Sequence, residues 1–581
     1  MSPAFERSLE LADGGRRAMV MLIVTAFVLV VFAVRLVDLQ AVRGAELADQ
    51  ALDQRLRTIT IAAQRGSILD ASGEPMAVTI EVRNLTVDQR LITDPMEVAR
   101  QLSPLLGVDA YRLSKRLAGT KPFAYVAKDL SIDTWRRIDQ LGIPGLFSEK
   151  STMRVYPGGD LAANVVGFVG AEGQGLGGLE YAYEDVLTGT SGSETYEGNP
   201  GGRLIPTAQR SVIAPEPGSS IRLTIDRDLQ FMAQELIAAQ VAKSGSDSGT
   251  VVVIDPRSGA VLALATVPTF DANDIASAPS DLLGNRALAN AYEPGSTSKV
   301  ATIAAVLDQG AAQPDTWFSI PAQIKRGPES FRDHDGGGKV SLTLAGVLAK
   351  SSNGGAILAA ERLGARTFYR YLRDFGYGEP TGLGFPGESA GHLPRLRDWN
   401  VATLPTAAFG QGLSVNAVQM AMVFATIAND GVRVQPRLVD SIVDPDGRNR
   451  PVEQGAQRRV VKASTARQVR RMLEMVVSEQ GTAPMAAIPG YRVAGKTGTA
   501  QFIDPSCGCY NGGVIASFIG LAPADDPALV VAVTLVNPRN GRYGGELAAP
   551  VFRKVMRYAL QARQVPPSQA RAPRMTLAAE G

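Results

Sequence analysis

The sequence predicts an α+β fold, in which one antiparallel sheet with flanking helices follows a single membrane-spanning helix. Three observations predict it. An uncharged apolar run occupies residues 18–34 near the N-terminus. Short strand patterns at 251–254 and 261–265 have their complements far along the chain, at 515–521 and 529–536. Helical patterns fill the interval, so we expect a sheet assembled from both ends of one domain with helices inserted between.

Length and composition are those of a globular protein with more than one domain. The chain has 581 residues, which exceeds the usual size of a single hydrophobic core. It is 45% hydrophobic and 20% charged, and its net charge is +2. Because the sequence contains no basic stripe interleaved with aromatic residues, we expect no nucleic-acid partner.

Residues 18–39 form the predicted transmembrane anchor. The apolar run reaches this length if the arginine in its last turn snorkels and the following aspartate lies at the interface, which is long enough to span a bilayer. Arg16 and Arg17 precede it, so we expect residues 1–17 in the cytoplasm and the rest of the chain outside. A cleavable signal peptide is the alternative, but no convincing small-x-small cleavage site follows the run.

Residues 40–220 are expected to form an α+β region between the anchor and the second domain. Residues 45–61 are a polar, helix-prone stalk that ends in a strand, and residues 82–87 have a strand pattern. Residues 95–117 are largely helical, with a break expected near Pro104. We find no chemistry in this region and expect a scaffold that raises the next domain above the membrane and offers a surface to partners.

Residues 221–563 are expected to form the second domain. Apolar residues alternate from 221 to 225 as in a strand, and Asp226 can cap a helix that runs to about Lys243. A final helix is expected from about 549 to 561. Residues 564–581 are rich in proline, alanine and arginine, and we expect a disordered tail.

A serine and a lysine lie one helical turn apart inside this second domain. Apolar residues recur at helical spacing from Ser296 to Gly310, so Ser296 is expected to open a helix. A hydroxyl there lies near unpaired backbone N–H groups and the positive end of the helix dipole, which favour developing negative charge. Lys299 follows at i+3, on the same face. Alone, this Ser-x-x-Lys pattern is weak, because both residue types are common.

Two further motifs follow in order. Ser351-Ser352-Asn353 supplies a Ser-x-Asn, and Lys496-Thr497-Gly498-Thr499 supplies a Lys-Thr-Gly. This set is typical of penicillin-binding proteins and class A β-lactamases. Each motif also has a structural explanation, as a helix start, a helix N-cap and a strand-end turn. Because all three occur in the typical order, we interpret them as one catalytic site.

On these motifs the chain resembles the class B penicillin-binding proteins, and most closely their cell-division branch, the FtsI type. Residues 65–73, RGSILDASG, are similar to the signature that opens the family's pedestal, and residues 154–170 and 177–180 resemble two later pedestal segments. Phe409-Gly410-Gln411-Gly412 resembles a segment near the family's active site, and we assign it a structural role. The resemblance implies the penicillin-binding transpeptidase fold, a five-stranded antiparallel sheet with flanking helices and a helical subdomain. It also implies that residues 40–220 form the family's elongated, non-catalytic α+β pedestal.

The resemblance also implies roles for the motif residues. Ser296 is the expected nucleophile, and Lys299 is the expected base, because no histidine is available and a lysine can serve if burial or a nearby positive charge lowers its pKa. Lys496 is the expected source of that charge. Ser351 relays protons to the leaving amine, and the backbone N–H groups of Ser296 and Thr499 form the oxyanion hole.

The remaining motif residues are expected to bind substrate. Asn353 holds a backbone amide of the substrate. Lys496 and the hydroxyls of Thr497 and Thr499 bind the terminal carboxylate of a D-Ala-D-Ala stem peptide. Gly498 is expected where the backbone and the substrate come close together.

The two cysteines and two histidines remain outside this scheme. Cys507 and Cys509 flank one glycine, and His334 and His392 lie in polar loops without the usual zinc-ligand spacings. We therefore expect no metal, no cofactor, and structural or solvated histidines. A disulfide across one glycine is strained and exported thiols are unusual, so the role of the cysteines stays open, with a loop near the active site favoured.

The leading hypothesis is a membrane-anchored serine D,D-transpeptidase that cross-links peptidoglycan and is acylated by β-lactams. Stretches at 65–78, 291–300 and 542–556 match the cell-division branch better than the elongation branch, so we expect it at the division septum. The family then implies an FtsW-type glycan polymerase and other division proteins as partners, with contacts to the pedestal and the membrane anchor.

Several rival functions share these motifs. An elongation-type class B transpeptidase is the nearest. A β-lactamase needs machinery that activates water, and Ser352 stands where class A enzymes carry an aspartate. A β-lactam sensor would be expected to carry a cytoplasmic signalling module, for which residues 1–17 are too few. A bifunctional class A protein is disfavoured because the region before residue 221 lacks an evident glycosyltransferase domain.

Overall fold

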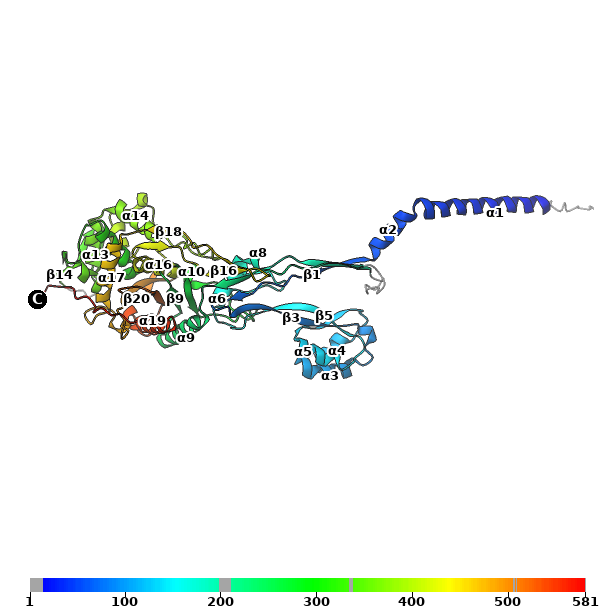
Figure 1. The fold of residues 1–581 in the computed structure, drawn as a ribbon, viewed down its shortest axis with the longest axis horizontal. Coiled ribbons are helices and arrows are strands. Elements are labelled where there is room, and N and C mark those ends of the chain that lie inside the picture. The colour runs from blue at the N-terminus through cyan, green and yellow to red at the C-terminus, as the bar shows by residue number, and fades with distance from the viewer. Residues whose placement is uncertain (1–13, 198–209, 334–337, 505–506, 508, 580–581) are drawn as a thin grey trace, which may run out of the picture. The chain divides into compact units, whose positions relative to one another are not determined.

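The computed structural model describes residues 14–197, 210–333, 338–504, 507 and 509–579 (Figure 1). The chain divides into two units. The first comprises residues up to 63 together with 190–216, and the second comprises 64–189 together with 217–581. We describe each unit by itself.

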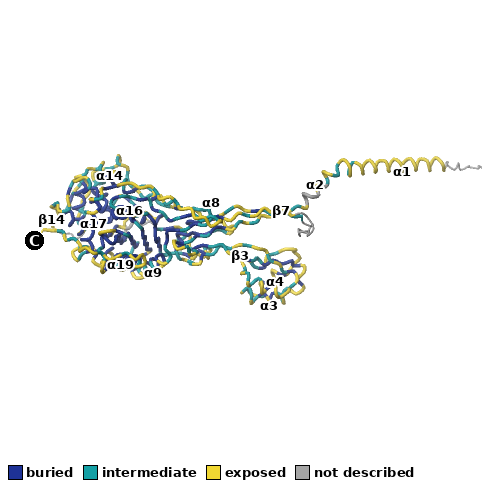
Figure 2. The backbone as a smooth tube through the Cα atoms, in the orientation of Figure 1, coloured by how far each residue is buried: buried dark blue, intermediate teal, exposed yellow. Residues whose placement is uncertain are grey.

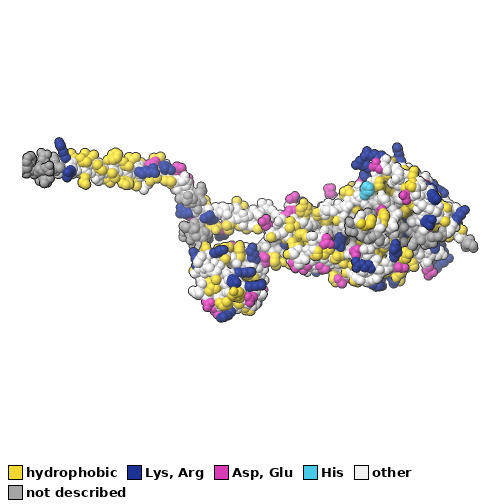
Figure 3. Space-filling model, turned by 180° about the vertical axis from the view of Figure 1, so that it is seen from behind, with side chains coloured by type: hydrophobic (Ala, Val, Ile, Leu, Met, Phe, Trp, Pro, Cys, Tyr) yellow, Lys and Arg dark blue, Asp and Glu magenta, His cyan; other side chains and the backbone are white. Residues whose placement is uncertain are grey.

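The first unit contains an apolar N-terminal helix and a small sheet. Helix α1 (Gly14–Val37) continues through a π-helical turn (Asp38–Val42) to α2 (Gly44–Arg55). The span Gly14–Val42 is long and apolar enough to cross a membrane, and Figure 3 shows hydrophobic side chains along it with basic side chains near both ends. This helix is consistent with the single-pass anchor expected at 18–39.

The same unit holds a three-stranded sheet that follows the anchor. Strand β1 (Leu56–Ile61) pairs antiparallel with β6 (Gly192–Glu197), which pairs antiparallel with β7 (Arg210–Ile213). The strand expected at the end of the stalk is therefore present. Its partners come from a segment more than a hundred residues further along the chain, which local pattern alone does not reveal.

The second unit begins with a mixed sheet, to which strands from residues 68–155, 220–223 and 439–451 contribute. Its strand order is β17-β16-β8-β2-β3-β4, with β5 also paired to β3. The strands are β2 (Ile68–Leu69), β3 (Pro75–Val87), β4 (Ala124–Leu130), β5 (Leu146–Val155), β8 (Ser220–Leu223), β16 (Val439–Val443) and β17 (Asn449–Pro451). The strand expected at 221–225 is therefore present as β8, but it pairs with β2 and β16 rather than with the main sheet.

A small helical lobe packs beside β3 with a hydrophobic core of its own. It contains α3 (Pro95–Leu106), α4 (Ala110–Leu117) and α5 (Ile132–Asp139). The expected break near Pro104 is present, between α3 and α4, but its cause is not the proline: Pro104 lies inside α3, and the helix ends at Leu106 with Gly107 as its C-cap. Gly107 adopts the left-handed conformation (φ 65°) and its N–H bonds to the Ser103 carbonyl, which is a glycine C-cap.

A buried ion-pair cluster joins the pedestal segments that carry the family resemblance. The carboxylate of Glu180, which is fully buried, accepts from Arg65 Nε at 2.7 Å and from Arg154 Nε at 2.8 Å. Arg65 also pairs with Glu184 at 2.7 Å. Segments 65–73, 154–170 and 177–180 therefore meet at this cluster of buried ion pairs.

The main sheet has five antiparallel strands in the order β10-β9-β21-β20-β19. They are β9 (Ser248–Ile254), β10 (Val261–Val267), β19 (Ala494–Asp504), β20 (Cys509–Ala522) and β21 (Leu529–Val536). β21 pairs with β9, so strands from the two ends of the domain meet in the middle of the sheet. This is the arrangement predicted from the sequence, and the middle of the domain that holds this sheet is dark blue, or buried, in Figure 2.

Helices cover both faces of this sheet (Figure 1). α9 (Arg227–Ser244), capped by Asp226 as expected, and α19 (Ala549–Ala562) pack on one face, and the fully buried α16 (Ala417–Ala428) packs on the other. The remaining helices are α6 (Ala163–Val166), α7 (Gly178–Ala182), α8 (Glu184–Leu187), α10 (Arg286–Ala289), α11 (Lys299–Asp308), α12 (Leu344–Ala349), α13 (Asn353–Glu361), α14 (Ala365–Phe375), α15 (Thr403–Ala408), α17 (Ala463–Val477) and α18 (Gly544–Leu547).

Short two-stranded sheets lie in the part of the chain between β10 and β19. β11 (Trp317–Ile320) pairs with β14 (Val340–Thr343), β12 (Ile324–Arg326) with β13 (Glu329–Phe331), and β15 (Val432–Val434) with β18 (Gln457–Arg459). All three pairs are antiparallel.

The C-terminal tail, expected to be disordered, docks on the domain over its described residues. The Tyr491 hydroxyl donates to the Val565 carbonyl at 2.7 Å, and Ser568 N donates to the Gly490 carbonyl at 3.0 Å. Further along, Thr343 N donates to the Leu577 carbonyl at 3.1 Å, and Leu577 is 4% exposed. The tail packs on the domain because individual apolar side chains such as Leu577 are buried. Its average composition, rich in proline, alanine and arginine, does not indicate these contacts.

Candidate active site

The nucleophile candidate lies in a tight turn that leads into a buried helix. Ser296 is inside a 3₁₀ turn (Gly295–Ser298), and α11 begins directly after it at Lys299. The prediction that Ser296 opens a helix is therefore correct in position but not in type. Gly295 adopts the left-handed region (φ 53°), which a β-carbon would make unfavourable. Ser296 is partly exposed, whereas Lys299 is fully buried.

Lys299 is held by the Ser-x-Asn motif. Its Nζ donates to the Ser351 carbonyl at 2.5 Å and to Asn353 Oδ1 at 2.7 Å, and it lies 3.4 Å from Ser351 Oγ. Burial lowers the pKa of Lys299 to about 7, against the opposing charge of Asp333. A substantial fraction of this amine is therefore neutral near neutral pH, which a general base requires.

Ser351 lies between the two motif lysines. Lys496 Nζ donates to Ser351 Oγ at 2.8 Å, and it also lies 3.3 Å from Thr497 Oγ1. Burial, reinforced by the positive charge of Lys299, lowers the pKa of Lys496 well below its ordinary value. We expected the charge of Lys496 to lower the pKa of Lys299. Instead, burial is the main cause of the lowered pKa of Lys299, and the charge of Lys299 contributes to the lowered pKa of Lys496.

The turn that carries Ser351 depends on a residue that the motifs did not indicate. Ser351 has φ 62°, a left-handed conformation rare for a residue with a side chain. Asp333 accepts from Ser352 Oγ at 2.6 Å, from Asn353 N at 2.6 Å and from Gly354 N at 2.8 Å. An acidic residue in a polar loop carries no local signal, so only the fold reveals this contact.

The Lys-Thr-Gly motif lies on β19, which packs against the nucleophile turn. A β-carbon on Gly498 would come 2.3 Å from Ser517 Oγ and 3.1 Å from Thr297 Cγ2. Gly498 is therefore required by packing against the neighbouring strand and the turn, in addition to the substrate approach we expected. Thr499 is exposed, and its Oγ1 accepts from Gly544 N at 3.4 Å.

These residues surround one cleft of about 720 Å³. Of the residues selected from the sequence, Ser296, Ser351, Asn353, Thr497 and Thr499 line it. Lys299 and Lys496 are buried, and both contact the hydroxyl of Ser351, which lines the cleft. Further lining residues that the sequence did not single out are Asp333, Gln480, Thr482, Arg542, Tyr543 and Glu546.

The glycine-rich segment 409–412 forms part of the cleft wall. Phe409 and Gln411 line the cleft. A β-carbon on Gly410 would come 2.1 Å from the Gly295 carbonyl oxygen, and Gly295 N donates to the Gly410 carbonyl at 3.0 Å. The structural role assigned to this segment is thus to pack directly against the nucleophile turn.

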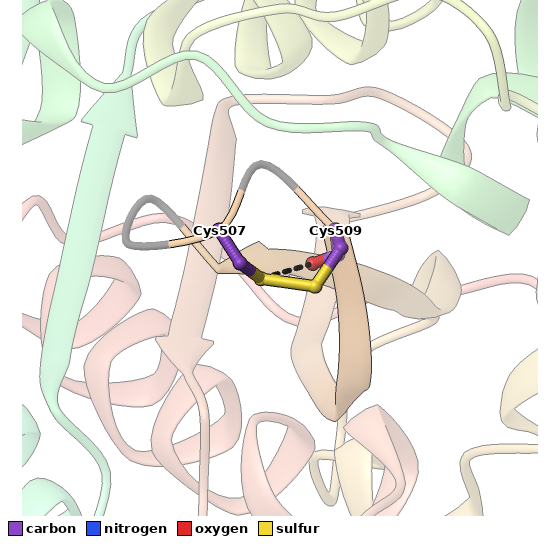
Figure 4. The surroundings of a disulfide bond; sticks show 2 residues. All are labelled: Cys507 and Cys509. Carbon is purple, nitrogen blue, oxygen red and sulfur yellow. Dashed lines mark hydrogen bonds between the residues drawn. A yellow bond between two sulfur atoms is a disulfide. The ribbon is translucent and has the colours of Figure 1, made fainter.

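The cysteines form a disulfide, Cys507–Cys509, at the β19–β20 connection (Figure 4). β19 carries Lys496 and Thr499, so the pair belongs to the hairpin that borders the cleft, the position favoured from the sequence. Both cysteines are exposed. His334 lies outside the described residues, and His392 is exposed, with its backbone paired to Ser414.

Comparison with known proteins agrees with this geometry. Residues 249–557 match the family model of the penicillin binding protein transpeptidase domain, and residues 60–223 match that of the penicillin-binding protein dimerisation domain. Penicillin-binding protein PbpB of Mycolicibacterium smegmatis is 38% identical, with 95% of this chain and 91% of PbpB covered. Peptidoglycan D,D-transpeptidase FtsI of Escherichia coli is 32% identical, with 92% and 89% covered.

A solved structure has the same fold. Penicillin binding protein 3 from Mycobacterium tuberculosis, complexed with aztreonam, superposes with a TM-score of 0.71 at 34% identity, covering 90% of this chain and 100% of that one. The family resemblance read from the three motifs is therefore confirmed. By its two matched domains, its fold and its relatives, this chain belongs to the class B penicillin-binding proteins.

Proposed function

We propose that this protein is a serine D,D-transpeptidase that cross-links peptidoglycan stem peptides through an acyl-enzyme on Ser296. The observation that carries the proposal is the Lys299–Ser351–Lys496 cluster behind Ser296, in which burial keeps the pKa of Lys299 near 7. Relatives named peptidoglycan D,D-transpeptidases support the same activity. β-Lactams acylate the same hydroxyl.

In the first half-reaction, Ser296 Oγ attacks the carbonyl carbon of the D-Ala-D-Ala peptide bond. Neutral Lys299 takes the hydroxyl proton, and Ser351 relays a proton from the resulting Lys299 ammonium to the nitrogen of the departing D-alanine. The backbone N–H groups of Ser296 and Thr499 stabilise the oxyanion, each donor contributing about 3 kcal/mol. The products are free D-alanine and an ester between Ser296 and the shortened stem peptide.

In the second half-reaction, an amine of a neighbouring stem peptide attacks this ester. The amine loses a proton through the same residues, Ser296 regains its hydroxyl, and a new peptide cross-link results. Before acylation, Lys496, Thr497 and Thr499 hold the terminal carboxylate of the donor, which later departs with D-alanine, by charge and hydroxyl hydrogen bonds, and Asn353 holds the donor's backbone. No step needs a metal or a cofactor.

The experiment that tests the acyl-enzyme is mass spectrometry of the protein after reaction with a labelled penicillin. We expect one adduct, located on Ser296. The Ser296→Ala protein should keep its melting temperature and carry no label. A label on another residue, or an unlabelled folded wild type, would contradict the proposal.

We further propose that residues 18–39 anchor the protein with residues 1–17 in the cytoplasm, followed outside by a pedestal at 40–220 and a catalytic domain at 221–563. The arginines before the apolar run support this orientation. Fusion of a reporter active only in the cytoplasm to each end tests it: activity is expected at the N-terminus and not at the C-terminus.

We also propose that the enzyme acts at the division septum, with an FtsW-type glycan polymerase and other division proteins as partners. Similarity to FtsI of Escherichia coli over nearly the whole chain supports this role. Depletion is expected to block septation while growth continues. Loss of elongation with intact division would instead favour the elongation-type alternative.

A further inference from the structure

A buried carboxylate lies just before the nucleophile turn, outside the three motifs. Glu293 precedes Ser296 by three residues and is 7% exposed. Its Oε1 accepts from Gly412 N at 2.9 Å, and its Oε2 accepts from the Tyr510 hydroxyl at 3.1 Å. Burial of a carboxylate is unfavourable unless hydrogen bonds replace water, so these two contacts account for its position.

The Gly412 contact joins Glu293 to the glycine-rich wall of the cleft. Tyr292 and Val415 exchange backbone hydrogen bonds of 2.8 and 2.9 Å. Gly295 N donates to the Gly410 carbonyl at 3.0 Å. The hydrogen bond from Gly412 to Glu293 lies between these two sets of backbone hydrogen bonds. The segment before Ser296 and the segment 410–415 are therefore hydrogen-bonded to each other at three successive positions.

The Tyr510 contact joins Glu293 to the strand pair on the other side. Tyr510 lies on β20, next to the Cys507–Cys509 disulfide, and β20 pairs with β19, which carries Lys496 and Thr499. Burial and the neighbouring Glu293 charge raise the pKa of Tyr510, which keeps its hydroxyl protonated as a donor. Tyr510 is 51% exposed, and its hydroxyl donates to Glu293, which ties this side chain to the segment before Ser296.

Glu293 belongs to the segment that carries Ser296. Its carboxylate accepts hydrogen bonds from the 409–412 segment and from the β19–β20 hairpin, which also border the cleft. We propose that Glu293 is a positioning residue, which holds the Ser296 turn against the 409–412 segment and the β19–β20 hairpin so that the nucleophile keeps its attacking geometry. This inference rests on the proposed function, because it concerns acylation of the same serine.

The test is the acylation kinetics of the full-length protein with a labelled penicillin, separated into the binding constant and the acylation rate constant. Glu293→Ala removes both contacts and is expected to lower the rate constant tenfold or more, since a displacement of about 1 Å costs on the order of 10²-fold. Glu293→Gln is expected to stay within about threefold of wild type, because its amide oxygen can accept from Gly412 and its NH₂ can meet the Tyr510 oxygen. Glu235→Ala, at an exposed position of α9, is the matched control.

Tyr510→Phe isolates the hairpin contact and changes only a half-exposed ring. We expect a smaller fall in the rate constant and an unchanged melting temperature. In the Glu293→Ala background the same substitution should add nothing, because the partner is already absent. Rescue by glutamine, together with this loss of additivity, separates positioning from a general loss of structure.

The outcomes distinguish this inference from the function on which it rests. If the wild type is not acylated on Ser296, the proposed function fails. If the wild type reacts and Glu293→Ala reacts at the same rate, only the positioning role is overturned. A Glu293→Gln protein as slow as Glu293→Ala also overturns it, because charge rather than contact would then matter. If Glu293→Ala does not fold, Tyr510→Phe decides, and an unchanged rate constant refutes the role.

Discussion

Lys496 donates a hydrogen bond of 2.8 Å to Ser351 Oγ. The contact joins β19 to the turn before α13, two elements more than 140 residues apart in the chain. Lys299 lies 3.4 Å from the same oxygen. One serine hydroxyl thus connects two buried lysines, to which we assign different roles, a base at Lys299 and a positive charge at Lys496.

Substitution of each lysine by arginine should separate their roles. Lys299→Arg is expected to abolish acylation, because a guanidinium does not lose its proton in a protein and cannot act as a base. Lys496→Arg should keep measurable activity, since its proposed role requires only positive charge. Labelling with a fluorescent penicillin measures both, and a Lys299→Arg protein that acylates at the wild-type rate would reduce Lys299 to an electrostatic role.

The acylation rate should rise with pH through the pKa of Lys299. The active form is the neutral amine, so the rate constant is expected to fall as pH drops below about 7, where Lys299 becomes protonated. The charged groups that face Lys299 are Asp333, whose charge raises this pKa, and Lys496. A pH profile of penicillin acylation measures the midpoint.

Asp333→Asn should shift that profile to lower pH. The amide keeps an oxygen that can accept from Asn353 N and Gly354 N, and its NH₂ can donate to Ser352 Oγ, but the negative charge is lost. Because the Asp333 charge raises the pKa of Lys299, its removal lowers that pKa. An unmoved midpoint in a protein of normal melting temperature would argue against this coupling.

The penicilloyl adduct should persist. Ser352, at the position of the class A aspartate, instead caps α13 by accepting from Gly355 N at 2.9 Å and donates to Asp333. Release of the label requires a base that activates water, and the three motifs supply no carboxylate for it, so slow release is expected. Repeated rapid hydrolysis of a chromogenic cephalosporin would instead favour the β-lactamase alternative.

Glu180→Ala should destabilise the pedestal strongly. The change leaves Arg65 and Arg154 buried without their shared carboxylate, and breaking a buried pair in this way typically costs about 3 to 5 kcal/mol. Thermal unfolding measures the effect. Glu172→Ala, at an exposed position of the same region, is the control and should leave the melting temperature unchanged.

The local sequence pattern was sufficient to predict those helices and strands whose defining residues lie within a few positions of one another. Asp226 caps α9 as predicted, because an N-cap needs only the side chain and the N–H groups two and three residues later. The alternating strands of the main sheet were also recognisable. The motif residues could be chosen by type and order, because the chemistry requires a hydroxyl, a lysine base and a carboxylate-binding cation.

Only the tertiary structure decided which distant segments meet. β8 had a correct strand pattern but joins β2 and β16, since alternation says nothing about the partner edge. Asp333 and Glu293 carry no local signal, and they matter because folding buries their carboxylates beside particular N–H and hydroxyl groups. The sequence by itself determined which groups can do the chemistry, and long-range packing decided their burial, and with it the pKa of Lys299 and the contacts that hold Ser296 in place.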